Sequence, residues 1–191
     1  MKVVAINGSA RRSGNTEQLI KMVFKELRKE GIVTESIHIG GKPIRGCTAC
    51  MKCWKNKNEE CVIKDDAVNQ YIQKVKESDA IILGSPSYFA NVSSELKAFI
   101  DRAGMVAKAN NDLFKRKLGT AVVVSRRSGE VQVFDAINHF FLIGQMIVVG
   151  SSYWNNGIGL NPGDVTSDRE GVITMQNLGN NIAWLLKKLS V

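Results

Sequence analysis

The sequence has no apolar run long enough to cross a membrane. Its longest candidate, Met146 to Val149 with its flanks, falls far short of the roughly 20 residues that a membrane helix needs. The N-terminal apolar stretch spans only Val3 to Ile6 before a glycine-rich turn, which is too short for the core of a signal peptide. Only three prolines occur in the chain, so long disordered linkers are not expected. We therefore expect a cytoplasmic protein with no membrane-bound part.

Cysteine is missing from nine-tenths of the chain, because all four cysteines fall between Cys47 and Cys61. A disulfide framework would spread its cysteines along the sequence. In a chain with no export signal, a single tight group of cysteines is more typical of a metal site. Histidine is also scarce, and the only two, His38 and His139, fall within an expected strand and an expected helix. We expect both to be structural rather than catalytic.

The length of 191 residues is typical of a single domain, and we expect residues 1–191 to form one. The formal net charge is +8, which raises the question of nucleic-acid binding. However, the basic residues are spread through helical segments and lack the interleaved aromatic residues that stack on bases. The charge therefore indicates a solvated basic surface, an acidic electron-transfer partner or a phosphorylated cofactor, and no nucleic acid is expected.

Apolar strands alternate with amphipathic helices along the whole chain. The predicted strands are Lys2–Asn7, Val33–Ile39, Asp79–Gly84, Leu118–Ser125 and Met146–Gly150. The first helical segment runs through Leu19, Met22, Val23 and Leu27 and ends at Gly31. The later ones are Ala67–Lys76, Ser93–Ala107, Val131–Ile143 and Gly171–Leu189. This order predicts an α/β fold with a five-stranded parallel sheet and helices on both faces. Ligands of such sheets bind at the carboxyl ends of the strands, here the loops after Asn7, Gly84, Ser125 and Gly150.

The loop after the first strand reads Gly8-Ser-Ala-Arg-Arg-Ser-Gly-Asn-Thr16 and leads into a helix. Free backbone N–H groups and the helix dipole favour an anion at such a place. The residues suited to a phosphate are Ser9, Arg11, Ser13, Gly14, Asn15 and Thr16. Neither the nucleotide-triphosphate loop nor the dinucleotide fingerprint is present, so a monophosphate suits the loop better. The alternative is that Ser13 or Asn15 is simply a helix cap.

The loop after the third strand carries a proline and two aromatic residues, in the order Pro86-Ser87-Tyr88-Phe89-Ala90-Asn91. Aromatic side chains at the carboxyl end of a central strand can form the wall of a site for a planar ring. The alternative is that Tyr88 and Phe89 pack beneath the loop, as aromatic residues commonly do.

The cysteines have the spacing Cys47-x2-Cys50-x2-Cys53-x7-Cys61, within a segment, 40–66, that shows neither helical nor strand periodicity. Three thiolates at x2 spacing can ligate three corners of a cubane while a fourth closes it, so the spacing predicts a 4Fe-4S cluster. Structural zinc usually takes two Cys-x2-Cys pairs set further apart. A zinc site and an unmetallated or oxidised group of thiols remain the alternatives.

The segments GSARRSGNT and GSPSYFANVSSELKAFIDR together resemble the NADPH-dependent FMN reductase superfamily of flavodoxin-like proteins. The resemblance continues through Ser125 to Glu130 and the last predicted strand. It implies a flavodoxin-like sheet of order 2-1-3-4-5 with FMN bound at the strand ends. The FMN phosphate would lie on Ser9 to Thr16. The ring would lie between two loops, whose contributing residues are Pro86, Ser87, Tyr88, Phe89, Asn91, Ser125, Arg126, Ser128 and Gly129.

Within that superfamily, the cysteine motif after the second strand is similar to that of the iron–sulfur flavoproteins. The similarity implies that electrons pass from a ferredoxin-type donor through a 4Fe-4S cluster to FMN, and on to dioxygen, peroxide or quinone. It also implies a homo-oligomer, a dimer or tetramer, in which the cluster of one subunit lies near the flavin of another. One alternative is an NAD(P)H-dependent flavin or quinone reductase without a cluster. A second is a redox sensor or zinc-binding protein that acts through Cys47 to Cys61.

Overall fold

A computed structural model describes residues 1–189 and places all strands in one parallel sheet. The strands of its main path are β1 (Lys2–Asn7), β2 (Val33–His38), β3 (Ala80–Pro86), β4 (Leu118–Ser125) and β5 (Ile147–Val148). Their order is β2-β1-β3-β4-β5, as predicted. The inner strands β1, β3 and β4 are buried along nearly their whole length, which explains their continuous apolar sequences. The architecture is therefore the flavodoxin-like α/β fold.

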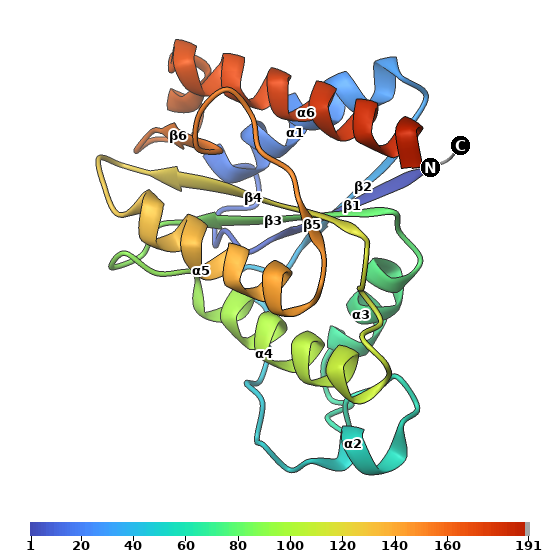
Figure 1. The fold of residues 1–191 in the computed structure, drawn as a ribbon. Helices are drawn as coiled ribbons and strands as arrows, with labels where there is room; N and C mark the ends of the chain where they lie inside the picture. Colours follow the sequence, from blue (N-terminus) through green and yellow to red (C-terminus); the bar gives the residue numbers. More distant parts are fainter. Residues whose placement is uncertain (190–191) are drawn as a thin grey trace.

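Helices cover both faces of the sheet, and each face has its own apolar core (Figure 1). On one face lie α1 (Asn15–Lys29) and α6 (Arg169–Leu189), and on the other α3 (Val68–Lys76), α4 (Ser94–Ala109) and α5 (Glu130–Ile143). The helices α3, α4, α5 and α6 begin and end within two residues of their predicted bounds, because the apolar spacing that predicts them is the spacing that the cores bury. Within residues 1–189, no helix has the length and apolar character that crossing a membrane requires.

The fifth strand differs from the prediction of Met146–Gly150. Only Ile147 and Val148 pair with the first half of β4, and the chain then leaves the sheet. It returns as β6 (Asn156–Ile158), which pairs with the second half of β4. Buried Asn155 stabilises the break, because its side-chain amide donates to Thr120 Oγ1 at 2.9 Å and its carbonyl accepts from the Val123 N–H. The detour brings 156–163 to the carboxyl end of the sheet.

The cysteine-rich segment 40–66 follows β2, as predicted, but it is not wholly irregular. It contains a short helix, α2 (Lys52–Asn56), and lies beyond α3 and α4 on the side away from the sheet (Figure 1). Two left-handed residues bound this helix, Met51 with a φ of 56° and Lys57 with a φ of 47°. A helix of five residues with no buried side chain has too few apolar positions to show a helical period. A short η1 turn (Asp164–Thr166) precedes α6.

Candidate flavin pocket and cysteine site

A pocket of about 140 Å³ lies where the loops after β1, β3, β4 and β6 meet. Nine of the residues predicted to bind FMN line it, namely Ser9, Arg11, Asn15, Thr16, Pro86, Ser87, Tyr88, Ser125 and Arg126. The pocket is at the carboxyl end of the sheet, where the topology of parallel strands predicts a ligand site. Segments up to 151 residues apart in sequence, such as those of Ser9 and Leu160, therefore form one site.

The loop after β1 is held in a fixed shape by its own backbone and by β2. The Ser9 N–H donates to Asn7 Oδ1 at 2.9 Å, and the Arg11 N–H donates to Ser9 Oγ at 3.2 Å. His38 Nε2 lies 2.7 Å from the Ser9 carbonyl oxygen, a contact that joins the end of β2 to this loop. Gly40 packs so closely that a Cβ atom there would lie 1.9 Å from the same oxygen.

The start of α1 suits a phosphate group. Its N-cap residue is Gly14, and no side chain caps the helix, so the first-turn N–H groups are available to a ligand. Thr16 is buried and lines the pocket. The side chain of Asn15, by contrast, is taken up by protein contacts: its amide donates to the Asn161 carbonyl at 2.9 Å, and its Oδ1 accepts from the Gly163 N–H at 2.8 Å. Neither Ser13 nor Asn15 is the cap of this helix.

The loops after β3 and β4 face each other across the pocket. Gly129 has a φ of 90°, and a Cβ atom there would lie 2.8 Å from Ser87 Oγ, so the close approach of the two loops requires glycine. Ser125 Oγ is buried and has no hydrogen-bond partner among the described residues, as expected of a donor that faces a ligand. Phe89 is fully exposed and does not pack beneath its loop. The remaining six predicted residues lie in these loops, or in the loop after β1, without lining the pocket: Ser13, Gly14, Phe89, Asn91, Ser128 and Gly129.

Gly159 and Leu160 also line the pocket, and sequence reasoning did not single them out. The Arg11 guanidinium donates to the Leu160 carbonyl at 2.7 Å, which joins the two sides of the site. The signal available in the sequence was the Gly- and Asn-rich segment after the last predicted strand. The loop after Gly150 was predicted to contribute to the site. Because the break between β5 and β6 was not predicted, the sequence did not indicate which residues of this loop reach the pocket.

The four cysteines come together on the other side of the molecule. All four are free thiols and line one narrow cavity of about 20 Å³, together with Arg102, Met105 and Val106 of α4. Cys47 and Cys50 are exposed, whereas Cys53 and Cys61 are half-buried. A four-iron core is larger than this cavity. The two exposed thiols, Cys47 and Cys50, are therefore the ones that must move to accommodate it. The donor set consists of thiols alone, which is the chemistry of an iron–sulfur or zinc site.

The local environment favours the thiolate form at the exposed edge of this cavity. A backbone hydrogen bond from Lys52, followed by one from the Thr48 hydroxyl, lowers the pKa of Cys50. Burial raises the pKa of Cys53. Within residues 1–189, no three His, Cys, Asp or Glu side chains converge as the ligands of a single metal ion do.

The two sites lie at opposite ends of α4. Its first turn follows the loop after β3, where the Ser93 N–H donates to Ser85 Oγ at 3.0 Å, and its second half lines the cysteine cavity. From Ser94 to Val106 the helix rises by about 18 Å. A flavin in the pocket and a metal group on the cysteines of the same chain are thus separated by roughly the length of this helix.

The chain is similar to proteins of known family along nearly its whole length. Residues 1–160 match the family described as NADPH-dependent FMN reductase. An iron–sulfur flavoprotein of Methanocaldococcus jannaschii is 39% identical, with 98% of each chain covered. One of Archaeoglobus fulgidus is 35% identical over 96% of this chain and 79% of that protein, and one of Methanosarcina thermophila is 31% identical over 98% and 96%.

Solved structures agree with the fold. The Trp repressor binding protein of Bacillus subtilis superposes with a TM-score of 0.66 at 19% identity and covers 92% of this chain and 96% of its own. A flavodoxin from the domain Archaea superposes with a TM-score of 0.63 at 19% identity, with 98% and 99% covered. The geometry of the strand-end pocket, the cysteine motif and these similarities agree, and the chain belongs to the iron–sulfur flavoproteins of the NADPH-dependent FMN reductase family.

Proposed function

We propose that this protein transfers electrons from a ferredoxin-type donor, through a 4Fe-4S cluster on Cys47, Cys50, Cys53 and Cys61, to FMN and on to dioxygen, peroxide or quinone. The observation that carries the proposal is the meeting of four free thiols in one cavity, on a chain whose strand ends form a separate flavin pocket. Bound FMN exchanges electrons singly or in pairs, whereas an iron–sulfur cluster exchanges them singly.

The flavin pocket has the groups that this role requires. The uncapped start of α1 offers N–H groups to a phosphate, with Thr16 and Ser9 beside it. Ser125 Oγ is a buried donor with no other partner among the described residues, and Tyr88 and Pro86 provide apolar contact for a ring. Arg126 is exposed at the rim, where its positive charge favours an anionic reduced flavin. The chain thus binds, orients and partly covers the flavin.

The cysteine segment suits an acidic one-electron donor. Lys52, Lys55 and Lys57 are exposed on and beside α2, and none of them takes part in an ion pair within residues 1–189. Trp54 lies among them and is 43% exposed. Unpaired cations around partly exposed thiols attract a negatively charged partner and increase its association rate. The exposed thiols then place the cluster within reach of that partner.

The distance between the two sites supports the proposal of a homo-oligomer. Along α4 they are about 18 Å apart in one chain, and the cysteine segment lies on the outer side of the helix layer (Figure 1). A second subunit whose flavin pocket faces this segment shortens the transfer. Sedimentation of the holoprotein tests this, and a monomer with full ferredoxin-driven activity contradicts it.

The cluster is tested by anaerobic purification followed by iron, sulfide, zinc and flavin analysis. We expect about four irons and four sulfides per chain, as one 4Fe-4S cluster requires. A Cys→Ser change at any of the four positions should remove the iron and leave the flavin, because the flavin contacts come from other loops. Asn56→Ser, in the same segment, is the matched control and should keep both. Stoichiometric zinc without sulfide contradicts the proposal.

The flavin is tested by releasing it with heat and identifying it, and we expect FMN. Thr16→Ala should weaken FMN binding by about tenfold or more, because a hydrogen bond to a charged group is worth about 1.5–3 kcal/mol. Thr34→Ala, on β2 and outside the pocket, should leave the affinity unchanged. Release of FAD, or equal affinities in the two variants, contradicts the assignment of the phosphate site.

A second candidate is an NAD(P)H-dependent reductase that uses the same pocket. A Bacillus subtilis protein described as a putative NAD(P)H-dependent FMN-containing oxidoreductase is 23% identical over 93% of this chain and 96% of its own. Stopped-flow reduction of the holoprotein distinguishes the two. NADPH should reduce the flavin of all Cys→Ser variants at the wild-type rate if this candidate is correct, whereas ferredoxin-driven reduction should fail in them if the main proposal is correct.

A further inference from the structure

Arg102 is the largest side chain that the fold buries completely, and the flavin pocket does not use it. It lies on α4, and its side chain is 0% exposed. Its ion-pair partner is Asp66, whose side chain is only 4% exposed. Placing a charged pair in the interior is costly unless hydrogen bonds satisfy it, so a pair at this position calls for a specific explanation.

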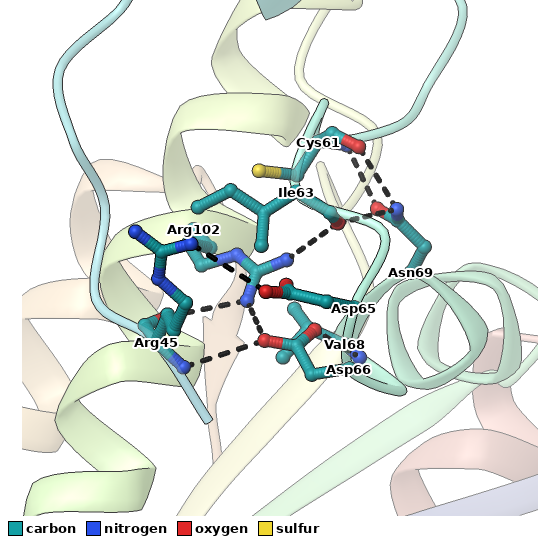
Figure 2. Close-up of polar contacts among 8 residues, drawn as sticks. All are labelled: Arg45, Cys61, Ile63, Asp65, Asp66, Val68, Asn69 and Arg102. Carbon is teal, nitrogen blue, oxygen red and sulfur yellow. Dashed lines mark hydrogen bonds and ion pairs between the residues drawn. The ribbon is translucent and has the colours of Figure 1, made fainter. Parts of the chain in front are cut away.

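The pair joins both ends of the cysteine segment to α4 (Figure 2). The Arg102 guanidinium donates to the Arg45 carbonyl at 3.2 Å and to the Ile63 carbonyl at 3.0 Å, and one of its NH groups also bonds to Asp66. Arg45 precedes the first cysteine, and Ile63 follows the last. One side chain therefore fixes the entrance and the exit of the segment that carries all four thiols.

The same side chain forms part of the wall of the cysteine cavity. Its Nε atom is buried and has no hydrogen-bond partner among the described residues. Cys61, which lines the same cavity, lies on the side of the guanidinium opposite Asp66 in Figure 2. An arginine side chain keeps its proton in proteins. The guanidinium thus stays charged beside a thiol.

Asp66 is held on the side of the guanidinium away from the thiols. Its Oδ2 accepts from the Arg45 N–H at 3.3 Å, and its Oδ1 accepts from the Val68 N–H at 3.1 Å at the start of α3. These bonds fix the carboxylate and so fix the direction of the pair. The guanidinium, the positive end, lies at the cysteine cavity, and the carboxylate, the negative end, lies at the N-terminus of α3. The pair carries no net charge, but the guanidinium is the member of the pair that faces the cavity.

We propose that Arg102 is a positioning residue with two effects. It holds the cysteine segment in the conformation that binds the cluster, and it raises the reduction potential of the cluster because it presents a buried positive charge at Cys61. This inference rests on the proposed function. When a low-potential one-electron carrier delivers one electron, the cluster and its four thiolates gain one negative charge, and no bond is broken. A nearby cation in a poorly hydrated site stabilises that added charge, and charge near the sulfurs is among the determinants of cluster potential.

The test is the one-electron midpoint potential of the cluster in the holoprotein, measured by anaerobic redox titration. The variant Asp66→Asn removes the negative end of the pair and should raise the potential. The double variant Arg102→Gln/Asp66→Asn removes both charges and should lower it, with at least a tenfold change in the reduction equilibrium constant, about 59 mV for one electron. Shifts of opposite sign are not expected of a residue that is merely structural. The variant Arg102→Lys keeps the positive charge but lacks the planar guanidinium with its several N–H donors. Its cluster potential should stay closer to the wild-type value than that of the double variant.

A matched control lies on the same helix. Lys97 and Asp101 form an ion pair at 2.6 Å, with both side chains partly exposed. The double variant Lys97→Gln/Asp101→Asn removes the same charges and should change the equilibrium constant less than twofold, because water screens exposed pairs. The FMN potential in every variant is the internal reference and should not move.

The outcomes separate the inference from the proposed function. If the wild-type protein holds no iron and sulfide, the proposed function fails. If it holds the cluster but Asp66→Asn and the double variant both keep the wild-type potential, the inference alone is wrong. If the double variant does not retain its cluster, the single variant Asp66→Asn decides, since an unchanged or lower potential there contradicts the inference.

Discussion

The flavin pocket and the cysteine cavity are at opposite ends of α4 and are held by different kinds of interaction. The pocket is formed by backbone segments at the ends of adjacent strands, and close contacts at Gly40 and Gly129 fix their spacing. The cavity is formed by one long segment outside the sheet, and a buried ion pair fixes its two ends. Sheet topology positions the first site, whereas side chains from α3 and α4 position the second. Arg102 bonds to both ends of the segment, and Asn69 bonds to the N–H and the carbonyl of Cys61.

This difference predicts how each site responds to substitutions. A strand-end pocket shares its supports with the sheet, so damage to it should be spread over many contacts and remain moderate. The cysteine segment depends on few long-range side chains, so the loss of one of them should have a large effect on the segment and little effect on the flavin. The following changes test that contrast.

Arg102→Ala should have the largest effect. Removing one partner of a buried ion pair leaves Asp66 charged and unpaired in the interior, which costs about 3–5 kcal/mol. We expect the free energy of unfolding, measured with urea, to fall by this amount. Lys97→Ala on the same helix should cost no more than about 1 kcal/mol, because its ion pair is exposed. Equal values for the two variants would show that the cysteine segment does not depend on the buried pair.

Gly40→Ala should have a smaller effect on stability and act on the other site. Its Cβ atom would collide with the backbone of Ser9, and such overpacking costs about 1–3 kcal/mol. Because Ser9 lines the flavin pocket, the FMN dissociation constant should rise while the iron content stays constant. Gly46→Ala is the control, since its Cβ atom would meet nothing within 4 Å. An unchanged FMN affinity would mean that the loop after β1 does not hold the flavin.

The same contrast explains what could be predicted from the sequence. The sheet order and the loops at the strand ends could be predicted from the alternating apolar segments. Alternating strands and helices form a parallel sheet, and the carboxyl ends of its strands bring the ligand-binding loops together. The break between β5 and β6 was missed because it depends on Asn155 bonding to Thr120, a contact that no local pattern shows.

The cysteine spacing predicted one compact site, and the structure brings its four thiols to one cavity. The role of Arg102 was not predicted, because in the sequence it is one basic residue within an amphipathic helix. Only the folded chain shows that it is buried and bonds to Arg45 and Ile63, which are 57 and 39 residues away.

Replacing the three unpaired lysines at α2 should have a moderate effect on kinetics alone. Lys52, Lys55 and Lys57 changed together to Gln should lower the second-order rate constant for reduction by an acidic ferredoxin about tenfold at low salt. The difference from wild type should shrink as salt is added. The control Lys25→Gln/Arg169→Gln/Lys188→Gln removes the same charge from α1 and α6, on the other face of the sheet. If the control slows reduction equally, net charge rather than the cysteine segment attracts the donor.

The smallest effect should come from acid. Burial raises the pKa of Asp66, but its bond to Arg102 and the Val68 N–H outweigh this and bring it below its ordinary value of 3.8. A carboxyl group whose pKa is lower in the folded than in the unfolded chain stabilises the fold above the unfolded value. That stability is lost as the pH falls through the folded value. The stability due to Asp66 should therefore be complete above about pH 4, near its ordinary pKa of 3.8, and decline below it. Urea unfolding of the metal-free full chain between pH 3 and 6 measures this change in stability. The metal-free chain is used because acid dissolves iron–sulfur clusters.

The variant Asp66→Asn should be less stable than the wild type at pH 6, and its free energy of unfolding should fall less on acidification. Parallel pH profiles for the two proteins would mean that the buried pair does not contribute to the acid sensitivity of the cysteine segment.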